Sequence, residues 1–185
     1  RDGFVVFNAT YRLAPKHTYP SAVDDLRDAL AWLKVSANKY EIDINKISGW
    51  GYSAGAHLLL LVGLNPEANL KALVCGGTPA DFSVWKSSPL VKGFMGCTYE
   101  ENAALWNEAS PVNQVQAASP PVFMYHGEWD FIVEIAQMQK MAQALESKNR
   151  PVETLRIPRM EHFGVYLFNR AWVDAGIKFI REKIN

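Results

Sequence analysis

The sequence predicts an α/β fold, with a mostly parallel β-sheet flanked by helices, in a single domain spanning residues 1–185. Two observations lead to this prediction. Short apolar runs alternate with longer segments whose apolar residues recur at helical spacing, which is the pattern of consecutive βαβ units. The chain has 185 residues, of which 49% are hydrophobic, so it is large enough to bury one core. Crossovers between parallel strands are expected to be right-handed.

Five short runs are typical of strands, because they are apolar, β-branched or aromatic and are bounded by turn residues. The predicted strands are Phe4–Tyr11, Lys46–Trp50, Leu70–Gly77, Pro121–Gly127 and Val152–Pro158. Strands buried on both faces read as near-continuous apolar runs, so this set indicates a sheet covered by helices on both sides.

Four segments follow helical spacing. The first helix is expected to begin at Ser21, which could cap it with Asp24 three residues on. The second, over Ala54–Leu64, is apolar nearly all round and is therefore expected to be buried. The third carries apolar residues between Ile135 and Leu145, and the fourth closes the chain between Trp172 and Ile184.

The segment from Ala80 to Pro120 departs from this alternation. It is rich in Ser, Trp, Pro and Gly and has no long regular period. Insertions between strands often cover a site at the carboxyl ends of the strands. We therefore predict a small, cap-like excursion over residues 80–120.

Composition excludes several classes of function. Nineteen basic residues balance nineteen acidic ones and no basic run occurs, which argues against a nucleic-acid partner. No apolar stretch approaches the roughly 18 residues of a membrane span. The two cysteines, Cys75 and Cys97, do not make a disulfide framework and leave the compartment open. A cytoplasmic location is the hypothesis we favour, although the chain opens without Met inside a strand pattern, so a signal peptide before Arg1 would be invisible.

A serine between two glycines stands where a predicted strand meets a predicted helix. Gly51, Ser53 and Gly55 form a G-x-S-x-G motif. Strand, sharp turn and buried helix are the setting of a nucleophile elbow, which exposes the serine Oγ at the edge of the sheet. The backbone N–H of Ala54, at the helix N-terminus, is then available to stabilise an oxyanion.

A serine nucleophile needs a base to take its proton, and the chain has four histidines. His17 lies in an early loop, and His57 points along the helix that follows Ser53. His126 precedes a glycine at the end of the fourth predicted strand and is expected to shape the turn. His162 follows the fifth strand, from where a loop can approach the serine, so His162 is the predicted base.

The base in turn needs a carboxylate that holds its tautomer and stabilises the imidazolium. Asp130 stands one short loop after the fourth predicted strand, with Glu128 as the alternative. Glu128 is nearer the strand and is expected to face solvent. The order Ser53, Asp130, His162 is also the chain order of a Ser…Asp…His triad at the edge of such a sheet.

These motifs together resemble an α/β-hydrolase-fold serine carboxylesterase of the hormone-sensitive-lipase and acetyl-esterase type, over nearly the whole length. The blocks that carry the resemblance are "YRLAPKHTYPSAVDDL", "GYSAGAHL", "ASPVNQVQAASPPVFMYHGEWDFIV" and "MEHFG". The resemblance implies the α/β-hydrolase fold, catalysis by a Ser-His-Asp triad without cofactor or metal, and a small-molecule ester as substrate. "SAGAHL" is also similar to kynurenine formamidases of the same fold.

The chain departs from that family in one respect. Members carry an H-G-G-G-type loop before the strand corresponding to Phe4–Tyr11, and its N–H groups complete the oxyanion hole. This sequence has no such loop. We therefore expect a sheet that lacks its N-terminal strands, with either a gap beside Lys46–Trp50 or closure onto Phe4–Tyr11. An exposed edge of this kind favours self-association into a homo-oligomer.

The predicted function is a serine hydrolase that cleaves short-chain carboxylic esters through an acyl-enzyme. Two alternatives remain, an arylformamidase-type amide hydrolase and a non-catalytic α/β-hydrolase-like binding module. No Cys/His cluster suggests a metal. Candidates for lining a substrate pocket are Tyr52, Trp85, Phe94, Trp106 and Trp129, although core packing explains each aromatic residue equally well.

Overall fold

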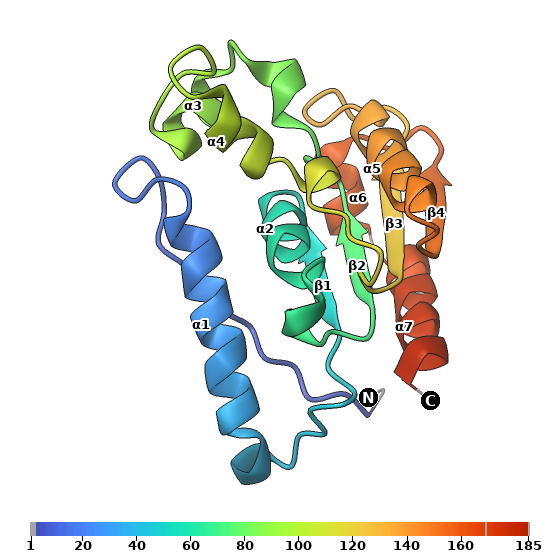
Figure 1. Ribbon diagram of the computed structural model, residues 1–185. Helices are drawn as coiled ribbons and strands as arrows, with labels where there is room; N and C mark the ends of the chain where they lie inside the picture. The colour runs from blue at the N-terminus through green and yellow to red at the C-terminus, as the bar shows by residue number, and fades with distance from the viewer. Residues whose placement is uncertain (1–2, 169, 185) are drawn as a thin grey trace.

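The centre of the computed structural model, which describes residues 3–168 and 170–184, is a four-stranded parallel sheet (Figure 1). Its strands are β1 (Gly49–Tyr52), β2 (Leu73–Gly76), β3 (Val122–Gly127) and β4 (Val152–Ile157). They lie in the order β1-β2-β3-β4, each parallel to its neighbour. All four carboxyl ends therefore meet at one edge of the sheet. Four of the five predicted strands are confirmed.

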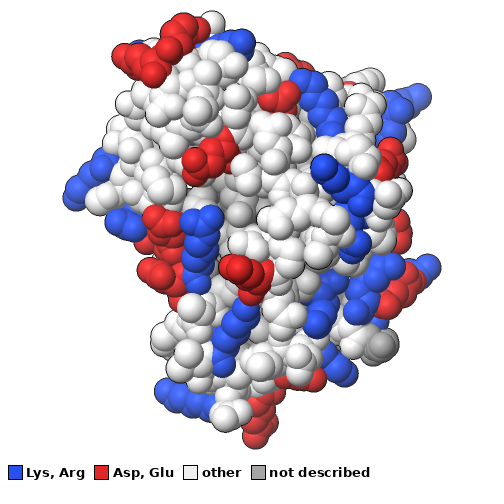
Figure 2. Space-filling view, in the orientation of Figure 1, with Lys and Arg blue, Asp and Glu red and all other residues white. Residues whose placement is uncertain are grey.

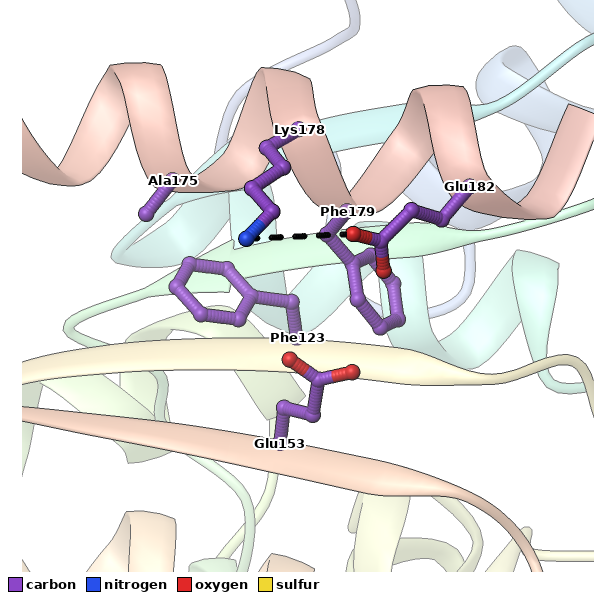
Figure 3. Close-up of a pocket in the computed structure, with 6 residues that line it drawn as sticks. All are labelled: Phe123, Glu153, Ala175, Lys178, Phe179 and Glu182. Carbon is purple, nitrogen blue, oxygen red and sulfur yellow. Dashed lines mark ion pairs between the residues drawn. The ribbon is translucent and has the colours of Figure 1, made fainter.

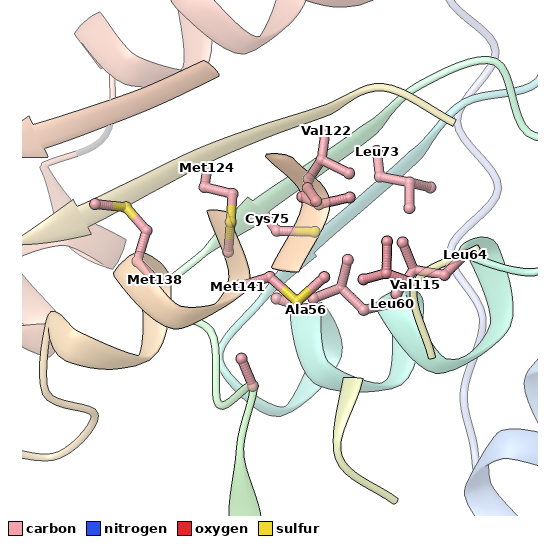
Figure 4. Packing of buried hydrophobic residues seen from close by; sticks show 12 residues of the cluster. Ala56, Leu60, Leu64, Leu73, Cys75, Val115, Val122, Met124, Met138 and Met141 are labelled. Carbon is pink, nitrogen blue, oxygen red and sulfur yellow. The ribbon is translucent and has the colours of Figure 1, made fainter. Parts of the chain in front are cut away.

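One face of the sheet is covered by α2 (Ala54–Gly63) and α5 (Ala136–Ser147). Alternate side chains of β2 and β3 point to this face, so that Leu73, Cys75, Val122 and Met124 pack against both helices (Figure 4). The helices contribute Ala56, Leu60, Met138, Met141 and Leu145, and Leu64 joins them directly after α2. This alternation is the period of two that a strand imposes on its side chains.

The other face is covered by α6 (His162–Leu167) and α7 (Arg170–Ile184). Here the intervening residues of the same strands, Val74, Phe123 and Tyr125, meet Val165 and Phe179 of the helices. Helices on both faces explain why the central strands read as uninterrupted apolar runs.

The prediction of a strand over Phe4–Tyr11 is wrong. The segment is extended coil, and the Val5 and Val6 side chains are 70% and 84% exposed. It lies against α1 instead, where the Phe7 ring stacks on Trp32 with centroids 5.6 Å apart. A strand needs a neighbouring backbone to bond, and within the described residues β1 pairs with β2 alone. Among the described residues, β1 therefore has the gap that was expected beside it, and Phe4–Tyr11 does not close onto it.

The first helix, α1 (Ser21–Val35), confirms the predicted element but not its cap. Pro20 is the residue before the helix, and no side chain caps its N-terminus. Ser21 is already the first residue of the helix, so it does not serve as the cap. Arg12 fixes the preceding loop by binding Asp25 of α1 with three nitrogens, its backbone N, Nε and Nη2, at 2.7, 2.9 and 2.8 Å from the carboxylate oxygens.

The excursion over residues 80–120 contains only short helices. These are η3 (Phe82–Trp85), α3 (Pro89–Met95), α4 (Ala103–Glu108) and η4 (Pro111–Asn113). In Figure 1, α3 and α4 lie at the end of the molecule toward which the strands point. Their apolar residues form a third cluster with α1 and the outer side of α2. Two further short helices, η1 (Ala37–Tyr40) and η2 (Pro66–Ala68), lie in the loops before β1 and β2.

The surface in Figure 2 carries acidic and basic side chains interspersed among uncharged residues, at its edges and in its middle. Neither sign of charge gathers into a continuous patch on this face, in keeping with the formal net charge of zero. In the part of the chain that the structure describes, no helix combines the length and the apolar character needed to span a bilayer.

Candidate active site

Ser53 lies in a strained turn between β1 and α2. Its backbone has φ 52° and ψ −121°, a conformation that costs a non-glycine residue about 1–3 kcal/mol. The turn is held by a hydrogen bond from Ser53 N to Gly76 O of 2.8 Å. A Cβ at Gly51 would lie 2.5 Å from Gly55 O and 2.6 Å from Ala56 N, so only glycine permits this close return of the backbone. The strand–turn–helix context that was predicted around Ser53 is confirmed.

The second glycine of the motif has a different environment. A Cβ at Gly55 would meet no atom within 4 Å, so the fold does not require glycine there. Gly55 stands in the first turn of α2, where backbone N–H groups have no acceptor within the helix. Ala54, the first residue of α2, is exposed, and the Ser53 side chain makes no capping bond to these N–H groups. Among the described residues, the first N–H groups of α2 thus lack a side-chain cap from Ser53, and the N-terminus of a helix is a site where an anion can bind.

His162 opens α6, directly after β4 and its following turn. The Glu161 carboxylate caps this helix by accepting from Phe163 N at 2.8 Å and from Gly164 N. Tyr52, the residue before the serine, donates its hydroxyl to His162 O at 2.5 Å. Met160 O accepts from Trp129 N at 3.0 Å, which ties the loop after β4 to the loop after β3. These contacts fix the backbone on both sides of the imidazole.

A continuous chain of hydrogen bonds joins the three predicted residues. His162 Nε2 lies 3.0 Å from Ser53 Oγ, and His162 Nδ1 lies 2.6 Å from Asp130 Oδ2. The structure thus brings together side chains that follow β1, β3 and β4. In this arrangement the imidazole can take the proton of Ser53 Oγ while Asp130 binds its opposite nitrogen.

Asp130 is buried and fully satisfied as an acceptor. Its Oδ1 accepts from Ile132 N at 3.0 Å and from Val133 N at 2.8 Å. Burial disfavours the charged carboxylate, but hydrogen bonds from His126, His162 and Val133 N–H outweigh it and hold the pKa of Asp130 well below its usual range. Asp130 is therefore ionised at neutral pH.

The alternative residues lie elsewhere. Glu128 faces Arg156, with 3.2 Å between Oε1 and Nε, at the surface. His57 is buried and stacks on Phe82, with Nδ1 3.1 Å from Pro79 O, and burial lowers its pKa to about 4. His17 stays in the loop before α1. Within the described residues, Ser53 Oγ is thus reached by His162 and not by these histidines.

The five candidates for a substrate pocket fall into three environments. Tyr52 contacts the His162 ring, with centroids 5.1 Å apart. Trp106 has no exposed surface and packs between Phe82 and Tyr99, so the structure places it in the core. Trp85 and Phe94 pack at the edge of the same cluster. Trp129 is 62% exposed, in the loop that carries Asp130.

Two aromatic residues beside His162 were not anticipated. The Phe163 ring stands edge-on to the imidazole, with centroids 5.7 Å apart, and Tyr166 packs against Tyr52 at 5.4 Å. Both side chains are more than half exposed. Their positions depend on α6, a short helix that begins at the histidine of the "MEH" segment and that no periodicity in the sequence indicates.

A hollow of about 210 Å³ lies away from these residues (Figure 3). It is lined by Phe123 and Glu153 of neighbouring strands and by Ala175, Lys178, Phe179 and Glu182 of α7. Phe123 and Glu153 are paired near the amino ends of β3 and β4, whereas Ser53 and Asp130 follow the carboxyl ends. Across the described ranges, no three His, Cys, Asp or Glu residues are grouped so that they could hold a metal ion.

The fold and this constellation define the class. The chain has an α/β-hydrolase fold, and it superposes with a TM-score of 0.72 on an alpha/beta hydrolase enzyme from a Medee basin deep-sea metagenome library, at 21% identity, covering 94% of this chain and 69% of that one. Residues 1–145 match the family model BD-FAE, and the chain belongs to that family.

Two further comparisons agree with this class. The chain is 30% identical to Esterase LipQ of Mycobacterium tuberculosis over 181 residues, which cover 86% of this chain and 42% of LipQ. It superposes with a TM-score of 0.84 on a truncated form of a carbohydrate esterase from gut microbiota, at 19% identity, covering 94% of this chain and 72% of that chain. The chain thus spans less than half the length of the curated esterase.

Proposed function

We propose that the protein is a carboxylesterase in which Ser53 is the nucleophile, His162 the general acid–base and Asp130 the residue that orients His162. The observation that carries the proposal is the unbroken set of hydrogen bonds from Ser53 Oγ through His162 to Asp130. The positive φ of Ser53 supports it, because strain of this kind persists where the surrounding structure holds a functional side chain in place.

In the first half of the reaction Ser53 Oγ attacks the ester carbonyl carbon while His162 Nε2 takes the hydroxyl proton. The carbonyl oxygen becomes an oxyanion, which the Ala54 N–H at the start of α2 stabilises. The tetrahedral intermediate then collapses, the bond to the alkoxy oxygen breaks, and His162 returns the proton to the departing alcohol. In the second half, water takes the place of the alcohol and releases the acid from Ser53 by the same steps.

Asp130 has two tasks in this scheme. As a carboxylate it accepts from His162 Nδ1, which leaves Nε2 unprotonated and facing Ser53. It also stabilises the imidazolium that exists while His162 holds the proton. Its low pKa keeps it charged across the pH range in which His162 works as a base.

The similarity to named esterases supports ester hydrolysis over other reactions of the fold. LipQ is named an esterase, and the superposed gut-microbiota structure is titled a carbohydrate esterase. From these similarities we infer only the reaction class, hydrolysis of a small ester. We do not infer a carbohydrate substrate, because the solved structures share little sequence with this chain. No cofactor enters the scheme.

We propose a short-chain preference, because the excursion over residues 80–120 acts as a small cap. It is compact, built on a cluster of aromatic side chains, and lies at the carboxyl end of the sheet. Each methylene added to an acyl chain contributes about 0.8 kcal/mol only while it is buried. Preference should therefore rise briefly from acetyl and fall by about octanoyl.

The test is kcat/KM of the intact protein across p-nitrophenyl esters from acetyl to dodecanoyl, with N-formylkynurenine as an amide comparison. A maximum at short chains supports the proposal. A profile still rising at dodecanoyl would contradict the small cap, and faster turnover of N-formylkynurenine than of every ester would favour the formamidase alternative. Absence of turnover on all of them, in folded protein, would favour a binding module.

A further inference from the structure

His126 is a buried histidine beside the proposed triad that the scheme above leaves without a task. It lies one residue before the end of β3 and has no exposed surface. Its Nε2 is 2.7 Å from Val133 O and 3.3 Å from Asp130 Oδ2. The Asp130 and His126 side chains are both almost wholly inaccessible to solvent.

The position of the His126 proton follows from its neighbours. Val133 O can only accept, so Nε2 must carry a hydrogen. His126 Nδ1 is buried and has no hydrogen-bond partner among the described residues. His126 therefore presents an Nε2–H to the loop after β3.

The Nε2–H of His126 faces two acceptors. It donates to Val133 O, and Asp130 Oδ2, the oxygen that accepts from His162 Nδ1, lies 3.3 Å from the same nitrogen. Asp130 Oδ1 meanwhile accepts from the N–H of Val133. His126 thus contacts Asp130 Oδ2 and also Val133, whose N–H binds the other oxygen of the same carboxylate. The loop after β3 is therefore joined to the strand at two points, Asp130 and Val133.

We propose that His126 is a positioning residue, whose Nε2–H holds Asp130 Oδ2 in the place from which it orients His162. This inference rests on the proposed function and adds a second histidine to it. Without the His126 hydrogen, Oδ2 keeps the donor from His162, and the loop over 130–133 loses its side-chain contacts with β3, while the 3.3 Å bond from Asp130 N to Gly127 O remains. His162 would then spend less time with Nε2 directed at Ser53 Oγ. The hydrogen bond from His126 also helps to keep the pKa of Asp130 low.

Substitutions at His126 separate positioning from packing. His126→Phe keeps the ring and removes the donor, and we expect it to lower kcat about 10- to 100-fold, the range for losing a hydrogen bond to a charged group. KM should change less than about threefold, since His126 does not reach the substrate. His126→Gln places an amide N–H near the former Nε2 and should recover most of kcat. A packing role alone predicts the opposite ranking, with the planar, ring-sized Phe better than Gln.

A double-mutant cycle with Asp130→Asn tests whether His126 acts through Asp130. In the Asp130→Asn background we expect His126→Phe to lower kcat less than about threefold, because the orientation of His162 is already lost. His57→Phe is the matched control, since His57 is also buried but lies away from Asp130. Its effect on kcat should be the same in both backgrounds.

Should His126→Phe not fold, as judged by thermal unfolding, His126→Asn replaces it in the cycle, because its amide is too short to reach Asp130 Oδ2. Equal kcat in the wild type and the folded variant, or effects that multiply fully with Asp130→Asn, would overturn the role of His126. If Asp130→Asn alone leaves kcat unchanged, the proposed function itself fails, and the role of His126 fails with it.

Discussion

Replacing Asp130 by asparagine should separate the orienting carboxylate from every other feature of the site. In the structure Asp130 Oδ2 accepts from His162 Nδ1 at 2.6 Å, while Oδ1 accepts two backbone N–H groups. Asparagine can keep its oxygen on the backbone N–H groups only by turning its NH₂ toward His162. His162 Nδ1 must then accept, which moves the imidazole hydrogen to Nε2.

An imidazole with its hydrogen on Nε2 cannot take the proton of Ser53 Oγ. The same exchange in a serine protease lowers kcat about 10⁴-fold, and a loss of that size is expected here. At 1.36 kcal/mol for each factor of ten, this corresponds to about 5 kcal/mol of transition-state stabilisation. KM should change little, because the substrate does not contact Asp130.

The assay is steady-state hydrolysis of p-nitrophenyl acetate by Asp130→Asn and by the matched control Glu128→Gln. Glu128 faces Arg156 at the surface, so its variant should retain wild-type kcat. Thermal unfolding of both variants shows whether a loss of kcat reflects a loss of fold. A full loss in Glu128→Gln with an active Asp130→Asn would refute the assignment of the acid.

Two further predictions concern stability. Gly51→Ala should lower the free energy of unfolding by about 1–3 kcal/mol, since its Cβ would lie 2.5 Å from Gly55 O. Gly55→Ala has open space around its Cβ and should leave the free energy of unfolding unchanged or raise it by up to about 1 kcal/mol. Urea unfolding that ranks Gly55→Ala as the more destabilising variant would contradict this account of the turn. His57 should make the free energy of unfolding fall as the pH drops from 6.5 toward 4, because burial lowers its pKa from 6.5 to about 4 and the unfolded chain binds the proton first. The loss should reach about 3 kcal/mol. A His57→Phe variant whose free energy of unfolding has the same pH slope would contradict this prediction.

The parts of the fold that the sequence predicted share one physical property. Each has a pattern that is visible in its own residues: α1, α5 and α7 repeat their apolar residues at helical spacing, α2 is apolar nearly all round, and β1 to β4 are short runs bounded by turn residues. The same reasoning located the elbow at Ser53, because Gly51 must be glycine for the backbone to return on itself. Asp130 and His162 followed from the rule that carboxyl ends of parallel strands meet at one edge.

The remaining features depend on neighbours that a local pattern does not reveal. Phe4–Tyr11 has the composition of a strand, but no described backbone lies beside it to form a ladder. Trp106 could equally line a pocket or fill a core, and only the packing of Phe82 and Tyr99 around it decided between them. His126 was expected to shape a turn, yet its bond to Asp130 depends on the loop over 130–133 folding back onto β3.

The expectation of a homo-oligomer stays a prediction, as does the cytoplasmic location. The open side of β1 is the reason to test for a homo-oligomer, because an unpaired strand edge can pair with a strand of another chain. Sedimentation of the intact protein over a range of concentrations measures the oligomeric state directly.

The nucleophile is most directly identified by covalent labelling. The intact protein is treated with a fluorophosphonate, which phosphonylates an activated serine, and the adduct is mapped by mass spectrometry in the wild type and in Ser53→Ala. We predict one adduct per chain, on Ser53, its disappearance in Ser53→Ala, and a rate of labelling that falls in Asp130→Asn and is unchanged in Glu128→Gln. An adduct on another serine, or ester hydrolysis that persists in Ser53→Ala, would contradict the proposed chemistry.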